Sequence, residues 1–280
     1  MTSFTRRTSR LTAGLGIAGS TVLLLAGPAA ADTSNATARA ALIEVLGAPV
    51  LDTGTEVASS DGTGADVLSS DSTSLLGGQT LLLAGVLAQA ALARANGTSA
   101  ACAGAVGDGG TIQIGASNAC TATIGTPGGV QVNLNAGIAT LGADAIYAEC
   151  TATTAGETGF ATLLNADIFL LGLPLPIDVA VNPAPNTPVL NIPGIASLIL
   201  NEQAPTADGG LMIRALHLTL LDNPATGDPL GEVIIGEVTC GPNAVTGPIS
   251  IFSGPALPLA ATAAVGVGAV AIIRRRRQTA

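Results

Sequence analysis

The sequence predicts an all-β fold, in which a β-sandwich lies between an N-terminal signal helix and a C-terminal transmembrane helix. Short apolar segments are separated by turns rich in the chain's 36 glycines and 16 prolines. Several segments alternate apolar and polar residues, which is typical of half-buried strands. We find no convincing long amphipathic helix in the body. Two packed sheets are the natural way to bury so much Val, Ile and Leu.

The first 31 residues resemble an export signal. An apolar, Gly-rich segment follows a basic start, and alanines at 29–31 provide a cleavage site. The basic residues are Arg6, Arg7 and Arg10. We therefore expect Asp32 to be the mature N-terminus, with an uncleaved anchor as the alternative. The paired arginines leave the twin-arginine export route open beside the general one.

The first half of the body is expected to begin with a polar lead-in, a strand at 41–50 and a long Ser-, Thr-, Gly- and Asp-rich loop. The lead-in covers 32–39 and the loop covers 52–78. Asn96-Gly97 is a strong hairpin signal, so we expect the segments on either side of it to pair. Those segments are 81–95 and 98–106. Further strands are predicted at 111–114, 120–124, 130–134 and 142–153, and a sub-boundary of the 32–254 body is expected near 125–129.

The second half of the body shows clearer strand patterns, separated by Pro- and Gly-containing turns. Strands are predicted at 160–171, 177–181, 189–192, 196–200, 211–221 and 232–240. In the fifth of these, Leu216, Leu218 and Leu220 form one apolar face, and the sequence places His217 with Ile213, Ala215 and Thr219 on the other face.

The C-terminal segment 255–273 is uncharged and long enough to cross a bilayer as a helix. Four arginines follow it and hold the 274–280 tail on the cytoplasmic side. They are Arg274, Arg275, Arg276 and Arg277. The predicted topology therefore places residues 32–254 outside the cell.

The charge of the predicted exposed body argues against nucleic-acid binding. All 19 acidic residues lie in it, but only three of the 10 basic residues do, which gives 3 − 19 = −16. Such a surface repels polyanions. Aromatic residues are scarce and Trp is absent, so stacking of sugars on aromatic faces is also disfavoured.

Four cysteines remain after the predicted signal, which implies two disulfides in an exported chain. Three pairings are possible, and the shortest loop favours Cys102–Cys120, which leaves Cys150–Cys240. We expect both bridges to be structural, because no Cys-x-x-Cys motif or nearby histidine indicates metal or thiol chemistry.

Candidate chemical groups are few. His217 is the single histidine, so a His-dependent nucleophilic triad would need it, but a half-buried structural role is favoured. Asp61, Asp66 and Asp71 lie in a Gly-rich segment that could hold Ca²⁺, although a flexible acidic loop is the favoured interpretation. Asn201-Glu202-Gln203 is expected to be a turn that caps backbone groups, with a binding spot as the alternative. We predict no cofactor, metal or catalytic residues.

Four segments together resemble the choice-of-anchor P family of actinobacterial surface proteins. They are ADAIYAEC (143–150), NIPGIASLILNEQ (191–203), IRALHLTLL (213–221) and EVIIGEVTC (232–240). The resemblance implies an exported, wall- or membrane-anchored protein without established activity. From the C-terminal helix itself we expect the membrane or cell envelope to be the partner, with a surface protein or another envelope component as a further candidate. No LPxTG motif precedes the tail, so attachment by an ordinary sortase is not expected.

Two functional hypotheses follow. The first is a non-enzymatic surface protein of structural, adhesive or interaction type. The second is a secreted hydrolase that uses carboxylates, such as a glycosidase. The scarcity of His, Lys, Tyr and Trp favours the first.

Overall fold

The computed structural model describes residues 31–75, 81–134, 139–170, 173–174, 179–193, 196–222 and 229–246. The predicted signal segment, apart from Ala31, lies outside these residues, as do the predicted transmembrane segment and Arg274 to Arg277. The described part is built from strands, so the all-β prediction is confirmed. No helix in this part is long and apolar enough to span a membrane.

The strands, in chain order, are β1 (Ala31–Val45), β2 (Ala48–Asp52), β3 (Glu56–Ser60), β4 (Val67–Ser74), β5 (Leu82–Leu83), β6 (Val86–Ala93), β7 (Ser99–Val106), β8 (Thr111–Ile114), β9 (Cys120–Thr123), β10 (Val130–Leu134), β11 (Ala139–Ala143), β12 (Ala145–Thr153), β13 (Gly156–Leu164), β14 (Asp167–Leu170), β15 (Leu173–Pro174), β16 (Thr187–Ile192), β17 (Ala196–Pro205), β18 (Leu211–Asp222), β19 (Pro229–Cys240) and β20 (Ala244–Thr246).

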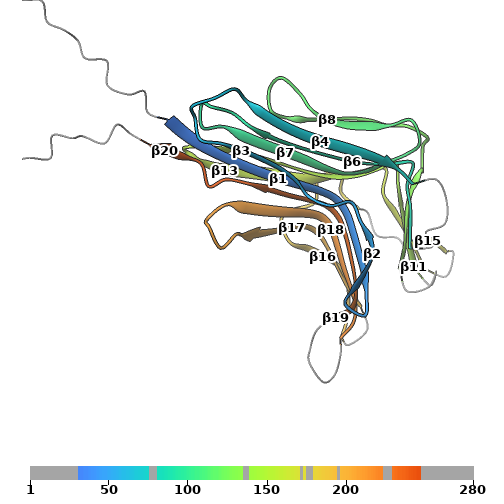
Figure 1. Ribbon diagram of the computed structural model, residues 1–280. Helices are drawn as coiled ribbons and strands as arrows, with labels where there is room; N and C mark the ends of the chain where they lie inside the picture. Colours follow the sequence, from blue (N-terminus) through green and yellow to red (C-terminus); the bar gives the residue numbers. More distant parts are fainter. Residues whose placement is uncertain are drawn as a thin grey trace, which may run out of the picture.

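These strands form three sheets and a separate hairpin. The large sheet has the order β16-β17-β18-β19-β1-β2, and β3 and β20 also pair with β1. The middle sheet has the order β13-β12-β7-β6-β4, and the end sheet has the order β15-β14-β11-β10-β5. The hairpin β8–β9 lies over the middle sheet on the side away from the large sheet (Figure 1).

The main core lies between the large and middle sheets. Alanines dominate the facing strands, including Ala38 on β1, Ala91 on β6 and Ala103 on β7, and all of them are buried. Small side chains allow the two backbones to approach closely at one point. A Cβ added to Gly236 on β19 would lie 2.6 Å from the carbonyl oxygen of Ala103, so only glycine fits there.

Three strands of the middle sheet continue along the chain, after short breaks, into three strands of the end sheet. The pairs β5/β6, β11/β12 and β13/β14 are consecutive in sequence, and their breaks fall at Gly85, Asp144 and Asn165–Ala166. The buried carboxylate of Asp144 accepts hydrogen bonds from the Gly128 amide and the Asn165 side chain. The hydrogen bond from Asn165 lowers the pKa of Asp144 most, and the bond from Gly128 lowers it further. The strands bend at these breaks, as Figure 1 shows for the end that carries β11 and β15.

Several predicted boundaries are wrong for identifiable reasons. The expected polar lead-in 32–39 is part of β1, because Ser34, Ala36 and Ala38 are buried on one face, while Asn35, Thr37 and Arg39 alternate with them on the other. The expected strand 41–50 is divided by a turn at Leu46–Gly47, where both residues have positive φ. The expected strands 142–153 and 160–171 are each divided by the bend. No strand forms at 179–181, the described part of the expected strand 177–181.

Other predictions agree with the structure. The segments around Asn96-Gly97 form the antiparallel pair β6–β7. The segment 52–78 is an exception: the sequence predicts a long loop with at most short strands, but it holds β3 and the eight-residue β4. Thr126 to Gly129 form the turn that returns the chain from the hairpin to β10.

Candidate functional site

A kink crosses four neighbouring strands of the large sheet at one level. The residues at this level are Asn201 on β17, Ala215 on β18, Gly236 on β19 and Ala40 on β1. Strand pairing stops at Leu200↔Leu216 and resumes at Glu202↔Arg214, and the same gap continues into β19 and β1. Two of the four residues have positive φ, Asn201 at 50° and Gly236 at 66°.

The kink changes which side chains share a face. Ala215 and Leu216 are adjacent in sequence, yet both are fully buried toward the middle sheet. Arg214 and His217 therefore both lie on the outer face, although they are three positions apart in the sequence. A regular strand would have placed them on opposite faces. The prediction that His217 shares a face with Ile213 and Ala215 is wrong, because both of those residues are fully buried on the inner face.

His217 lies between two carboxylates. Its Nδ1 is 2.7 Å from Oε2 of Glu202 on β17, and its Nε2 is 2.8 Å from Oε1 of Glu232 on β19. Its side chain is 13% exposed, so the prediction of a half-buried histidine is confirmed. Both ring nitrogens can donate to carboxylates only in the imidazolium form.

The contacts continue from Glu202 across the sheet. Arg214 donates from Nε to Glu237 at 2.7 Å and from Nη1 to Glu202 at 3.2 Å. Arg39 on β1 lies 3.9 Å from Glu237 and 3.6 Å from Asp52, and it donates to the hydroxyl of Thr55. We call this set the charged row. Its members are Glu232, His217, Glu202, Arg214, Glu237, Arg39 and Asp52.

The pKa values in the charged row reflect this pairing. The hydrogen bond from His217 lowers the pKa of Glu202, partial burial opposes the shift, and the charges of His217 and Arg214 reinforce it. Burial acts to lower the pKa of Arg214, but Glu237 and then Glu202 more than offset it, so the pKa is raised. Both shifts favour the charged forms that hold the row together.

Sequence reasoning identified His217 and Glu202 as candidates but did not bring them together. The 201–203 segment is not the expected turn, because it lies within β17. Its side chains do bind backbone groups, since Asn201 donates to the Pro183 carbonyl and Gln203 donates to the Gly159 carbonyl. The partners on β19 were missed, because only the register of the folded sheet makes Glu232 and Glu237 neighbours of β18.

The three carboxylates of the acidic segment 61–71 already bind groups of the protein. The Asp61 carboxylate accepts hydrogen bonds from the amide and hydroxyl of Thr63, which lower its pKa. Asp66 instead pairs with Arg94 at 2.7 Å, and Asp71 accepts a hydrogen bond from the amide of Ser72. Among the described residues, no three His, Cys, Asp or Glu side chains converge as metal ligands.

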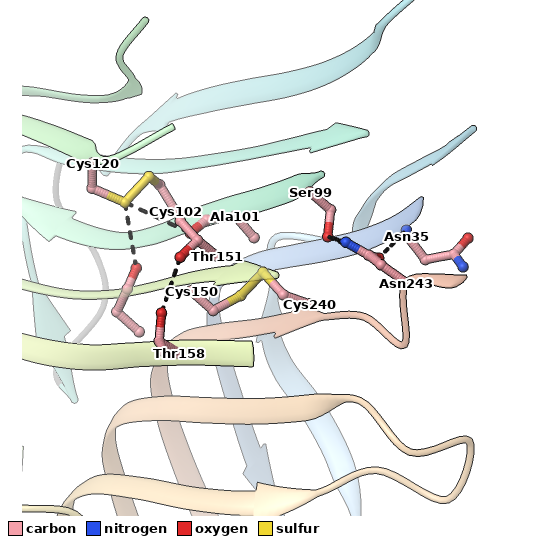
Figure 2. The surroundings of a disulfide bond; sticks show 11 residues. Asn35, Ser99, Ala101, Cys102, Cys120, Cys150, Thr151, Thr158, Cys240 and Asn243 are labelled. Atoms are coloured by element: carbon pink, nitrogen blue, oxygen red, sulfur yellow. Dashed lines mark hydrogen bonds between the residues drawn. A yellow bond between two sulfur atoms is a disulfide. The ribbon is translucent and has the colours of Figure 1, made fainter. Parts of the chain in front are cut away.

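Both predicted disulfides are present and join different layers (Figure 2). Cys102–Cys120 attaches the hairpin β8–β9 to β7, and Cys150–Cys240 joins β12 of the middle sheet to β19 of the large sheet. Glu149 lies beneath the hairpin and accepts a hydrogen bond from the Cys120 amide. Burial raises the pKa of this carboxyl, and that hydrogen bond opposes the shift.

A cavity of about 520 Å³ lies between β4, β6 and β8. Its polar lining is mostly hydroxyl, from Ser70, Ser72, Ser74 and Thr111, and Asp71 is the one ionisable residue that lines it. The charged row lies on another face of the molecule. A hydrolase that uses two carboxylates needs both beside one substrate, and this cavity offers only one.

Comparisons with known proteins assign no family to this chain. No protein-family model and no curated protein matches the chain. Among solved structures, a DUF1329 family protein from Desulfovibrio piger aligns with a TM-score of 0.17 and 8% identity, over 78% of this chain and 87% of that chain. A likeness of this degree supports no argument about fold or function.

Proposed function

We propose that this chain is an exported, non-enzymatic cell-surface protein of structural, adhesive or interaction type, in which a β-sandwich body is held at the membrane by a C-terminal helix. The pairing of β1 with β20 carries the proposal. Ala31, Asp32 and Thr33 lie opposite Thr246, Val245 and Ala244. The two ends of the body therefore lie side by side, so the anchor would attach at the same end where the signal is removed (Figure 1).

The sequence of the C-terminal segment fits a membrane anchor. Residues 255–273 would extend about 28 Å as a helix, against a hydrocarbon core of about 30 Å. The four arginines at 274–277 would stop on the cytoplasmic side. Two interlayer disulfides agree with an oxidising exterior. The resemblance to choice-of-anchor P proteins points the same way and implies an actinobacterial host.

The charged row supports a structural role for the outer face of the large sheet. Each of its seven members contacts an oppositely charged neighbour or the histidine. Groups held this way stabilise the arrangement of four strands, and they would have to leave their partners before acting as nucleophile or base. Contact with another surface or protein requires no such release.

The anchor is tested by membrane retention in the native host. A chain that ends at residue 254 should appear in the culture medium, whereas the full chain should sediment with membranes. A Val265→Arg/Val270→Arg variant should also be released, because two charges in the apolar segment prevent stable insertion. The matched control, Val265→Leu/Val270→Leu, should stay with the membranes. Retention of the chain that ends at 254 would contradict the proposal.

The hydrolase hypothesis remains the second candidate, and Glu202 is its best carboxylate because His217 orients it. Purified protein should show no turnover on panels of glycosidase, esterase and protease substrates. Turnover that Glu202→Gln or His217→Ala abolishes would favour the enzyme, provided that each variant still shows a thermal unfolding transition and is therefore folded.

A further inference from the structure

The corner where β1 begins contains a buried carboxylate oxygen without a partner. Oδ1 of Asp32 is fully covered, and no described group forms a hydrogen bond with it. It is the one such side-chain atom among the described residues. Leaving a buried acceptor unsatisfied is costly, and more so when the group carries charge. Among the residues that the structure describes, none supplies the donor that this oxygen lacks.

The surroundings hold the Asp32 side chain in place. Strand β20 pairs with the backbone on one side, and Asn96 forms a parallel bridge to Asp32 on the other. Gly97 lies so close that a Cβ added to it would be 2.7 Å from the Cβ of Asp32. The Asn243 side chain fastens this corner by bonding to Gly97, Ser99 and Asn35, the last two of which Figure 2 shows.

Charges nearby are already engaged. Arg94, at the start of the adjacent turn, directs its guanidinium to Asp66 and to the side-chain oxygen of Asn118. Glu157 lies against Gly241, just before β20, and adds negative charge to this end. The described residues of β20 carry no charge. No cation in these elements is directed at Asp32.

We propose that removal of the signal after Ala31 supplies the missing partner, because the new α-ammonium of Asp32 forms an ion pair with its own buried carboxylate. The inference rests on the proposed cleavage site. The nitrogen and the carboxyl carbon of an aspartate are separated only by Cα and Cβ, so the new positive charge is adjacent to the oxygen. Before cleavage this nitrogen is a neutral amide. Processing thus converts an unsatisfied corner into a paired one and makes the mature chain more stable than its precursor.

The test compares chains of defined start, each extending to Ala280 and held in the same detergent. One begins at Asp32, and the other retains Ala29 to Ala31, which moves the ammonium about 10 Å along the chain. The Asp32 start should unfold about 2–4 °C higher at pH 6.5. In an Asp32→Asn background the Asp32 start should lose this advantage, and only the longer chain keeps Ala31 paired with Thr246.

The pH dependence has a definite sign. The α-ammonium carries its charge at pH 6.5 and loses it at high pH, so the added stability should be present at the first pH and lost at the second. The advantage of the Asp32 start should vanish near pH 10.

Equal unfolding temperatures at pH 6.5, or an advantage of the Asp32 start that persists in the Asn background or at pH 10, would overturn the inference. The comparison does not depend on where the host cleaves the chain. N-terminal sequencing of the exported protein tests the cleavage site separately, so failure of one can be told from failure of the other.

Discussion

At the scale of single residues, His217 is the group on which most of the charged row depends. It touches Glu202 and Glu232 on the two flanking strands, and its side chain is largely covered. Without it, two carboxylates would face each other across β18 with no donor between them. The like charges of these two carboxylates would then repel each other.

Replacing His217 with Ala should therefore lower the free energy of unfolding by about 1–3 kcal/mol, because Glu232 loses its donor and Glu202 keeps only its contact with Arg214. Urea unfolding at pH 7 measures this loss. Thr219→Ala is a matched control on the same face of β18, and it should change stability by less than about 0.5 kcal/mol. Equal effects of the two substitutions would contradict the role assigned to His217.

Glu202 makes the stability that the charged row provides depend on pH in the acid range. Its pKa is lowered in the folded state, so its contribution to stability is present above the unfolded-state value and is lost as pH falls through the folded value. Between about pH 5 and pH 3, wild-type protein should lose more stability than Glu202→Gln, which cannot titrate. Thermal unfolding at several pH values gives both slopes, and identical slopes would refute the expectation.

At the scale of secondary-structure elements, the kink of the large sheet is set by backbone geometry. Gly236 has φ +66°, and an added Cβ would meet the Ala103 carbonyl and, at 3.0 Å, the Ala148 amide. Gly236→Ala should cost about 2–4 kcal/mol of stability, through both steric overlap and positive φ. Gly64→Ala is the control, because a Cβ there meets nothing within 4 Å. A neutral Gly236→Ala would show that the sheets can separate without cost.

The disulfides differ in the length of chain they close. Their cysteines are 18 residues apart in Cys102–Cys120 and 90 residues apart in Cys150–Cys240. In the loop-entropy account, removal should cost about 3 kcal/mol for the first pair and about 4.5 kcal/mol for the second. Denaturant unfolding of the two double Cys→Ala variants tests the order. A larger loss from the Cys102–Cys120 pair would contradict it.

Local chemistry made some elements predictable. Asn96-Gly97 identified β6 and β7, and alternating residues identified β8 and β10. The start of β1 was missed because a segment in which alanine alternates with Asn, Thr and Arg is weakly hydrophobic. In the structure these alanines are buried between the large and middle sheets. The kink could not be predicted, since it follows from four strands bending together. For the same reason, the sequence named His217 and Glu202 without showing that they touch.

At the scale of the whole molecule, the body has a defined direction. Its two ends lie together where β1 meets β20, and the β1–β2 turn lies at the other end of β1 (Figure 1). If residues 255–273 cross the membrane, the β1–β20 end faces the membrane and the Leu46–Gly47 turn points away. Leu46, in this turn, is 74% exposed.

The central claim is that the body lies outside the cell, begins at Asp32 and is held by its C-terminal tail. Protease treatment of intact host cells, followed by mass spectrometry of the released and membrane-bound peptides, tests it directly. We predict release of body peptides that begin at Asp32, while peptides containing Arg274 to Arg277 stay with the membrane fraction. A body that is cut only after the cells are broken open would contradict the account.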